Sequence, residues 1–472
     1  MVKRTGAALP RVLQLEFNEI CPSLLDDFMG RGLLPNFKRF YDSSMVFTTD
    51  ADAEHPNLEP WIQWVTLHSG LPFEMHGIRH LGEGRDQPKK ALAELLSDHG
   101  IRVGVFGSMN MNYCGLNGYN IPDPWDQAGQ AEPASLQPFY GFVSKQVQES
   151  SGAGGIGPGN ALNFAWFMAR HGLKPSTALA LVRQLADERR DGALRWRRAC
   201  LLERLQYDLF RHLNRKFDVR FATFFCNSTA HFQHYYWRNM APEAFAEAPG
   251  PEDHESLAAA ILEGYQSMDR LLGQIMRDYP EDVLVLCSAL SQRPWTDTAK
   301  CTYRPREFDA LFEFAGLPKG MARAQPVMAE QFHVVFESAE AAGEGEQRLR
   351  SLEIGGEPLL ILEREGNGFL AGCSVFTTGR EDELIRCTSD GATMRFGDLF
   401  QLVHGRRSGR HHPEGVLWVR NGHHAVHPDK VPLTDVAPTI LAHFGVAKPD
   451  HMGGQPLPLV PTSAPARPAK AA

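Results

Sequence analysis

The sequence contains no run of 18 apolar residues and no pair of cysteines at CxxC spacing. A transmembrane helix needs such a run, and the basic N-terminal stretch reaches Glu16 without the apolar core of an export signal. Several of the eight cysteines lie inside apolar runs such as VLVLCSAL, where cysteine behaves as a small hydrophobic residue. We therefore expect reduced cysteines, a cytoplasmic location and no membrane partner.

Excess positive charge is also absent. The chain has 48 Lys and Arg against 56 Asp and Glu, which gives a net charge of -8 and argues against broad nucleic-acid binding. The content of 43% hydrophobic and 22% charged residues is ordinary for a globular protein. At 472 residues the chain exceeds a typical domain of about 100 to 200 residues. It therefore has room for one large domain with insertions, or for two to three domains.

Buried-strand patterns alternate with amphipathic helical patterns along much of the chain. Alternation of this kind favours an α/β fold, with a mostly parallel central sheet flanked by helices. The expected strands lie at 11–19, 101–109, 218–227, 282–290 and 415–420.

Two segments break the alternation. Residues 127–160 are typical of a loop, and the helical period dominates from about 161 to 214, which predicts a helical cap insertion. A second insertion is expected to be small and α+β, with a hairpin that turns at 365–368. The predicted organisation is core at 1–140, helical cap at 141–215, core at 216–324, small insertion at 325–395, core at 396–457 and a disordered tail at 458–472.

The stretch EHPNLEPWIQWVTLHSG (54–70) predicts a buried helix that begins at Pro60, with Glu59 at its mouth. The unpaired N–H groups and the dipole of a helix N-terminus favour an anion, so we expect Glu59 to be ionised. A carboxylate there suits a general base, a nucleophile or a ligand. The alternative is a charged N-cap, which would stabilise the helix by about 0.5 to 2 kcal/mol without chemistry.

LTDVAPTILAHFGVAKPDHMGGQPL (433–457) closely resembles the terminal signature of the alkaline phosphatase superfamily, nearest to its phosphodiesterase and nucleotide pyrophosphatase branch. GLLPNFKRF (32–40), VTLHSGLPFEMHGI (65–78) and Tyr265 with Asp269 match the same family in the same order. The resemblance implies the alkaline phosphatase-like α/β fold over the chain outside roughly 140–215 and 325–395.

The family places two metal ions, usually zinc, at the C-terminal ends of the central strands, with a Thr or Ser nucleophile on the second. Its first Asp ligand falls at Asn18, and its nucleophile falls beside Glu59 and Pro60. Two further ligands of the second metal fall at Ala289 and Leu290. The resemblance therefore implies that the second metal is absent and that ordinary phosphate monoesters and diesters give only background turnover.

The ligands of the other family metal are partly retained. The family's Asp-x-x-x-His matches Ala230 and His234, with His231 nearby, and its final His matches His411. Three imidazoles, His231, His234 and His411, are thus predicted to bind one divalent ion, zinc or manganese. The alternative is that His231 and His234 cap loops or bond to core groups.

Further polar residues surround these positions. Glu16 and Glu19 flank Asn18, and alternation places Glu16 and Asn18 on one face and Glu19 on the other if the strand continues. Near Glu59 they would form a carboxylate pair for acid/base chemistry; the alternative is a solvated strand end.

The basic loop beside His411 carries Arg407 and Arg410, and His412 follows it directly. These three side chains are expected to hold an anionic substrate. The alternative is a solvated run of charge.

The first functional hypothesis is therefore a hydrolase or group-transfer enzyme with a rebuilt site, acting on a small anionic substrate such as a nucleotide or sugar phosphate. The second is a catalytically silent member that binds an anion or a partner protein. The third is a metal-independent enzyme that uses Glu59 with Glu16 or Glu19 on a glycosyl phosphate. The sequence leaves all three open.

Overall fold

The computed structural model describes residues 10–126, 128–149, 158–246, 248–250, 253–296, 300–326 and 331–459. A nine-stranded sheet forms its centre. The strands are β1 (Val12–Phe17), β2 (Ser44–Asp50), β3 (Val103–Phe106), β4 (Gly118–Ile121), β5 (Phe221–Cys226), β6 (Val283–Ser288), β19 (Glu414–Arg420), β20 (Ala425–Val426) and β21 (Val431–Pro432). Their order is β20-β2-β19-β6-β1-β5-β3-β4, and β21 pairs with β2. Only β19 runs antiparallel to its neighbours in this described sheet, so the predicted α/β class with a mostly parallel sheet is confirmed.

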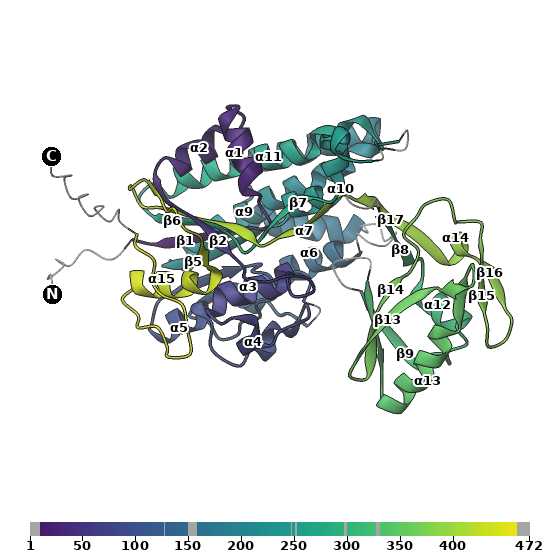
Figure 1. The fold of residues 1–472 in the computed structure, drawn as a ribbon. Coiled ribbons are helices and arrows are strands. Elements are labelled where there is room, and N and C mark those ends of the chain that lie inside the picture. Colours follow the sequence, from purple (N-terminus) through teal and green to yellow (C-terminus); the bar gives the residue numbers. More distant parts are fainter. Residues whose placement is uncertain are drawn as a thin grey trace, which may run out of the picture.

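Helices cover both faces of the sheet (Figure 1). One face carries α1 (Pro22–Gly30), α2 (Pro35–Tyr41), α9 (Arg198–Lys216) and α11 (Ala260–Asp278), and the other carries α3 (Pro60–Ser69), α4 (Phe73–His76), α5 (Leu92–Asp98) and α15 (Val436–His443). Strand β1 shows the alternation that separates the two layers. Leu13, Leu15 and Phe17 pack on the first face, and Val12 packs on the second.

The helical segment contains α6 (Gln137–Glu149), α7 (Pro158–Arg170), α8 (Pro175–Arg190) and α9. Helix α6 falls where the sequence predicted a loop. Its Phe139, Tyr140 and Val143 are buried in the same core as α1 and α11, and tertiary packing of this apolar side stabilises the helix despite a polar composition. Part of the expected loop, residues 150–157, lies outside the described residues.

A smaller lobe lies beside the main sheet (Figure 1). Its elements are β8 (Lys300–Pro305), α12 (Phe308–Phe314), β9 (Ala322–Pro326), β10 (Phe332–Phe336), α13 (Ala339–Arg350), β11 (Leu352–Ile354), β12 (Glu357–Pro358), β13 (Leu360–Glu365), β14 (Gly368–Cys373), β15 (Leu384–Cys387), β16 (Thr393–Arg395), α14 (Phe396–Leu399) and β17 (Phe400–Arg407). The predicted hairpin is confirmed, because β13 pairs antiparallel with β14. The lobe begins before residue 325, since Cys301, Tyr303 and Leu311 belong to its separate core.

In the described part of the chain, no helix is both long enough and apolar enough to cross a membrane. The predicted tail lies outside the described residues from 460 onward.

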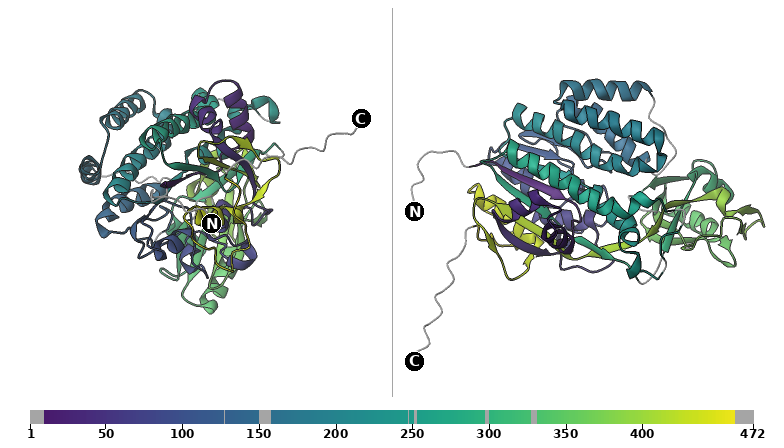
Figure 2. Two further views of the ribbon diagram at one scale, coloured as in Figure 1. Left: turned by 90° about the vertical axis from the view of Figure 1, so that its left-hand side faces the viewer. Right: turned by 90° about the horizontal axis from the view of Figure 1, so that it is seen from above.

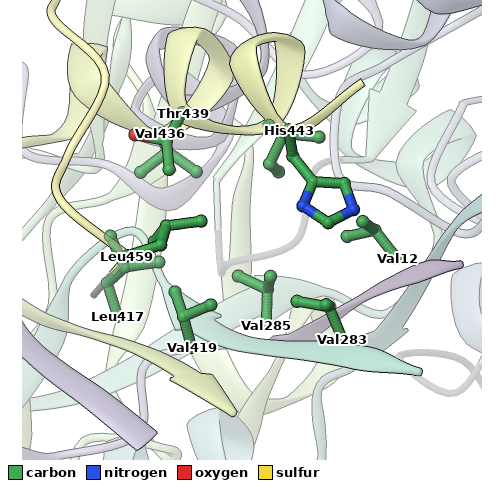
Figure 3. A pocket seen from close by; sticks show the side chains of 10 residues that line it. Val12, Val283, Val285, Leu417, Val419, Val436, Thr439, His443 and Leu459 are labelled. Carbon is green, nitrogen blue, oxygen red and sulfur yellow. The ribbon is translucent and has the colours of Figure 1, made fainter. Parts of the chain in front are cut away.

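An apolar hollow lies between α15 and the sheet (Figure 3). Val12 and Val283 line it, and each is the first residue of its strand. The hollow therefore lies at the amino ends of β1 and β6, at the opposite sheet edge from the polar groups that follow β1. Its lining of Val, Leu and Ile side chains, with Thr439 and His443 at helix α15, offers little for catalysis.

Candidate functional site

The carboxyl end of β1 meets helix α10 (Ser228–Met240) and a ribbon of two short strands, β7 (Ser291–Pro294) and β18 (Gly409–His412). Gly409 allows the ribbon to pack against α10, because a Cβ there would lie 2.2 Å from the carbonyl oxygen of Gln233. The amide of Ser408 also donates to the carbonyl of His234 at 2.8 Å. This packing brings His411 against His234.

Glu19, His234 and His411 form one group whose potential ligand atoms lie within 4.8 Å of one another. Oε2 of Glu19 is 3.2 Å from Nε2 of His234 and 3.6 Å from Nε2 of His411. Glu19 reaches them because β1 ends at Phe17 and Glu19 adopts a left-handed conformation, with φ of 56°. The strand therefore does not continue to Glu19, as the alternation argument had assumed, and the chain turns its carboxylate toward α10.

The Glu19 carboxyl and the His411 imidazole both have pKa values well below neutral pH. Burial would raise the pKa of the Glu19 carboxyl, but the His234 and His411 imidazoles and hydrogen bonds from His234 and Gln292 outweigh burial and lower that pKa to about 2. Burial lowers the pKa of the His411 imidazole to about 4, against the opposing charge of Glu19. At neutral pH the site therefore holds an ionised carboxylate beside a neutral imidazole.

The two ring nitrogens of His411 have different surroundings. Nε2 is buried and has no hydrogen-bond partner in the described part of the chain. The ring does hydrogen-bond to the backbone of Leu58, so that bond belongs to Nδ1, which also lies 3.5 Å from Oε2 of Glu59. These contacts place the proton on Nδ1 and leave the lone pair of Nε2 facing Glu19.

Glu59 directly precedes helix α3, as predicted, and occupies its N-cap position. Its backbone is extended, with φ of -121° and ψ of 139°, and its side chain makes no capping hydrogen bond to the helix. The carboxylate instead reaches the His411 ring. The simple capping alternative therefore does not describe this side chain.

Asn18 is held by three hydrogen bonds within the protein. Its Nδ2 donates to Oε1 of Glu19 at 3.1 Å and to Oδ1 of Asn227 at 2.8 Å, and its Oδ1 accepts from Nε1 of Trp64 at 2.8 Å. Ala289 and Leu290 are fully buried in the apolar core that contains Trp64. An amide and apolar side chains thus occupy the positions that the family resemblance assigned to ligands of a second metal.

Glu16 is fully buried beneath α3, apart from the Glu19 group. Its Oε1 lies 2.9 Å from Nε2 of His68 and accepts from Nε2 of Gln14 at 2.8 Å. The expectation that Glu16 and Asn18 share a face is confirmed, since both contact α3. Of the two flanking carboxylates, the structure brings Glu19 to the histidines, and it places Glu16 with His68.

In the described residues the group of potential ligands holds two of the three predicted imidazoles, with Glu19 rather than His231 as its third member, so the three-imidazole arrangement stays a prediction. The HxxH pair lies on helix α10, where three positions turn the side chain by roughly 300° and move it one turn along the axis. The His231 ring packs against Tyr235, with ring centroids 5.2 Å apart. Glu19 takes the third place in the group.

The three residues predicted to bind an anion do not all lie on the same side of the ribbon. Arg407 lies close enough to lower the pKa of His411. Arg410 and His412 alternate with His411 along β18 and so face the other side of the ribbon. There His412 experiences the charges of Glu414, Arg293, Lys430 and Asp50. Arg407 thus acts on the group electrostatically.

Sequence reasoning missed Gln292, which lies opposite His411 in the ribbon. Its Nε2 donates both to Oε2 of Glu19 and to the carbonyl of Ala230, the latter at 3.0 Å. Gln292 therefore fixes the Glu19 carboxylate from the side opposite Asn18. The available signal in the sequence was the position of Gln292, an amide residue that directly follows strand β6 and residues 288–291.

No protein-family model matches the sequence, and no curated protein does. Solved structures do match it at low identity. Wild-type alkaline phosphatase PafA is 11% identical, with 96% of this chain and 99% of that chain covered and a TM-score of 0.45. Murine ectonucleotide pyrophosphatase/phosphodiesterase 5, in complex with AMP, is 11% identical, with 93% and 96% covered and a TM-score of 0.40. Phosphonoacetate hydrolase from Sinorhizobium meliloti 1021, in complex with phosphonoacetate, is 14% identical, with 91% and 95% covered and a TM-score of 0.37.

Proposed function

We propose that this chain is a metal-dependent enzyme that acts on a small phosphate-bearing substrate by hydrolysis or group transfer, through a mononuclear site of Glu19, His234 and His411. The observation that supports it best is the buried Nε2 of His411. This atom has no hydrogen-bond partner in the described chain, and it faces a carboxylate oxygen 3.6 Å away. A buried acceptor in that position normally needs a partner.

The donor set suits a divalent ion. Two imidazole nitrogens and one carboxylate oxygen are a common ligand set of catalytic zinc sites with one open position, and manganese accepts the same donors. Glu19 is ionised and His411 is neutral, which are the forms that bind a metal. A bound ion would polarise a phosphoryl oxygen and lower the pKa of a water molecule.

The surrounding side chains hold the donors in place. Gln292 and Asn18 donate to the two carboxylate oxygens of Glu19. The backbone of Leu58 and the carboxylate of Glu59 both lie at the Nδ1 side of His411, which is the usual support of a metal-binding histidine. Glu59 is a carboxylate beside the donor set, 3.5 Å from Nδ1 of His411, so we assign it the transfer of a proton to or from the substrate.

The substrate class follows from charge and from the family resemblance of the motifs. Arg407 supplies positive charge beside His411, which suits a phosphate group. The resemblance aligns Glu59 with the hydroxyl nucleophile of the family, so ordinary aryl phosphate esters are expected to give only background turnover. We therefore look for the substrate among nucleotides and sugar phosphates.

The test is a panel of nucleotides and sugar phosphates incubated with the full chain and zinc or manganese, with products followed by phosphorus NMR. We expect turnover of at least one compound that Glu19→Gln abolishes and that the control His423→Gln retains. Metal-independent turnover that Glu59→Gln abolishes would instead support the two-carboxylate alternative. Anion binding without turnover would support a silent member, and either result overturns the proposal.

A further inference from the structure

Exposed apolar side chains gather on helices α7 and α8. Leu162 and Trp166 of α7 are 72% and 61% exposed, and Leu179, Val182 and Leu185 of α8 are 49%, 64% and 53% exposed. These five make up half of the large hydrophobic side chains that are exposed in the described part of the chain. Single exposed hydrophobic residues are normal, but a group on adjoining helices indicates an interaction surface.

The five side chains lie on the exposed sides of two consecutive helices. Helix α7 buries Phe167 and Met168, whereas Leu162 and Trp166 lie on its exposed side. Helix α8 buries Thr177 and Gln184. Residues 171–174 link the two helices, and the blue segment of residues 158–190 lies at the outer edge of the molecule in Figure 2. We call the exposed side of helices α7 and α8, with these five apolar side chains, the α7–α8 face.

The same segment carries a basic excess. Between residues 158 and 190 the chain has five Lys and Arg against two Asp and Glu, a net charge of +3 in a chain of net charge -8. Arg183, Arg189 and Arg190 are exposed on α8. Arg170 lies over the Trp166 ring, with Cζ 4.5 Å from its centroid. Exposed apolar and cationic side chains therefore occur together on these two helices.

We propose that the α7–α8 face is a docking surface for an anionic lipid bilayer. Leu, Val and Trp side chains would enter the interface while the arginines bind lipid phosphates, as in peripheral amphipathic helices. The Trp166 ring suits the headgroup level of a bilayer. There the ring can contact lipid tails while the neighbouring Arg170 stays with the hydrated headgroups. Such attachment needs no spanning helix, and it differs from the sequence expectation of no membrane partner, which rested on the lack of a long apolar run.

Two other occupants fit the face less well. A symmetric dimer through this surface would place two segments of net charge +3 against each other. A nucleic acid would use the arginines and could stack a base on Trp166, but it would leave the exposed Leu and Val side chains without an apolar partner. An anionic bilayer uses both the charge and the apolar area.

The test is flotation of the full chain with vesicles of phosphatidylcholine alone or of phosphatidylcholine with phosphatidylglycerol. We expect binding to the anionic vesicles only, weakened by salt. The double variant Trp166→Ser with Val182→Ser is expected to lower the bound fraction about tenfold or more. The matched control, Ile361→Ser with Leu384→Ser, removes side chains that are 53% and 58% exposed on the small lobe and should bind like the wild type.

A second variant keeps the apolar side chains and removes charge. Replacing Arg183, Arg189 and Arg190 with Gln should weaken binding to anionic vesicles and reduce its salt dependence. Any one of three results would overturn the proposal: no binding of the wild type to anionic vesicles, equal losses in the patch and control variants, or a dimer seen by sedimentation equilibrium that only the patch variant loses. The last result would make the face a protein interface.

Discussion

Two sides of the carboxyl end of β1 have opposite characters. Toward α10, Glu19 lies with His234 and His411 in a group of potential ligand atoms within 4.8 Å. Toward α3, the amide of Asn18 is fully hydrogen-bonded to protein groups, and the fully buried Leu290 lies in the core that contains Trp64. The family resemblance implies a metal on each side, but among the described residues a group of potential ligands is found on the α10 side alone.

The difference places a group of potential donors beside packed core at the end of one strand. On the α10 side the resemblance aligns the family's Asp with Ala230, and the carboxylate of the group comes from Glu19 in another segment. On the α3 side the positions that the resemblance aligns with ligands hold apolar side chains, which need no polar partners. On our proposal a carboxylate donor is therefore supplied from a different place in the sequence.

The largest expected effect comes from restoring a charge on the α3 side. Leu290→Asp would bury a carboxylate without a partner, and we expect it to lower the free energy of unfolding by about 3 to 5 kcal/mol. The control Leu290→Met should cost less than about 1.5 kcal/mol. Urea unfolding measures both. A stable Leu290→Asp variant that binds a second metal would show that the α3 side is still a latent site.

Glu59→Gln tests the support of the α10 side. Because a carboxylate beside Nδ1 orients a metal-binding histidine, we expect metal affinity or turnover to fall by about 10- to 100-fold. The melting temperature should hardly change, since the side chain makes no capping bond. Glu54→Gln, an exposed residue in the same loop, is the control. Lost stability with unchanged metal affinity would make Glu59 structural.

Asn18→Asp probes the boundary between the two sides. The amide donates to Oε1 of Glu19 and to Oδ1 of Asn227, and an Asp carboxylate would face both oxygens without a hydrogen to donate. We expect a loss of about 1 to 3 kcal/mol in the free energy of unfolding. Asn18→Ser, which keeps a donor, should cost less. Full stability of Asn18→Asp together with added metal binding would contradict this account.

His231→Ala should have the smallest effect. The ring lies outside the ligand group and packs against Tyr235, so we expect metal affinity to change by less than about twofold, with at most about 1.5 kcal/mol lost in stability. His234→Ala is the positive control, measured by titration calorimetry. Equal losses of affinity in the two variants would restore the three-imidazole site.

The fold could be predicted because its strands are continuous apolar runs such as VLVLCSAL, which only a covered sheet can bury. The early start of the small lobe and helix α6 were missed, because their burial depends on contacts with distant segments. Composition alone does not reveal such contacts.

Part of the site could also be predicted. His234 and His411 follow from the motif order, and Glu59 follows from Pro60 at the start of α3. The place of Glu19 depends on its φ of 56°, and regular strand alternation predicts the opposite face. Gln292 is in place only because β7 pairs with β18, which no local pattern indicates.

The most direct test of the central claim is the metal content of the purified full chain after exposure to zinc or manganese and removal of excess ion. Elemental analysis should find about one ion per chain in the wild type and in His231→Ala, and almost none in Glu19→Gln, because that change removes the only anionic member of the donor set. No bound metal in the wild type, or the same content in Glu19→Gln, would contradict the assignment.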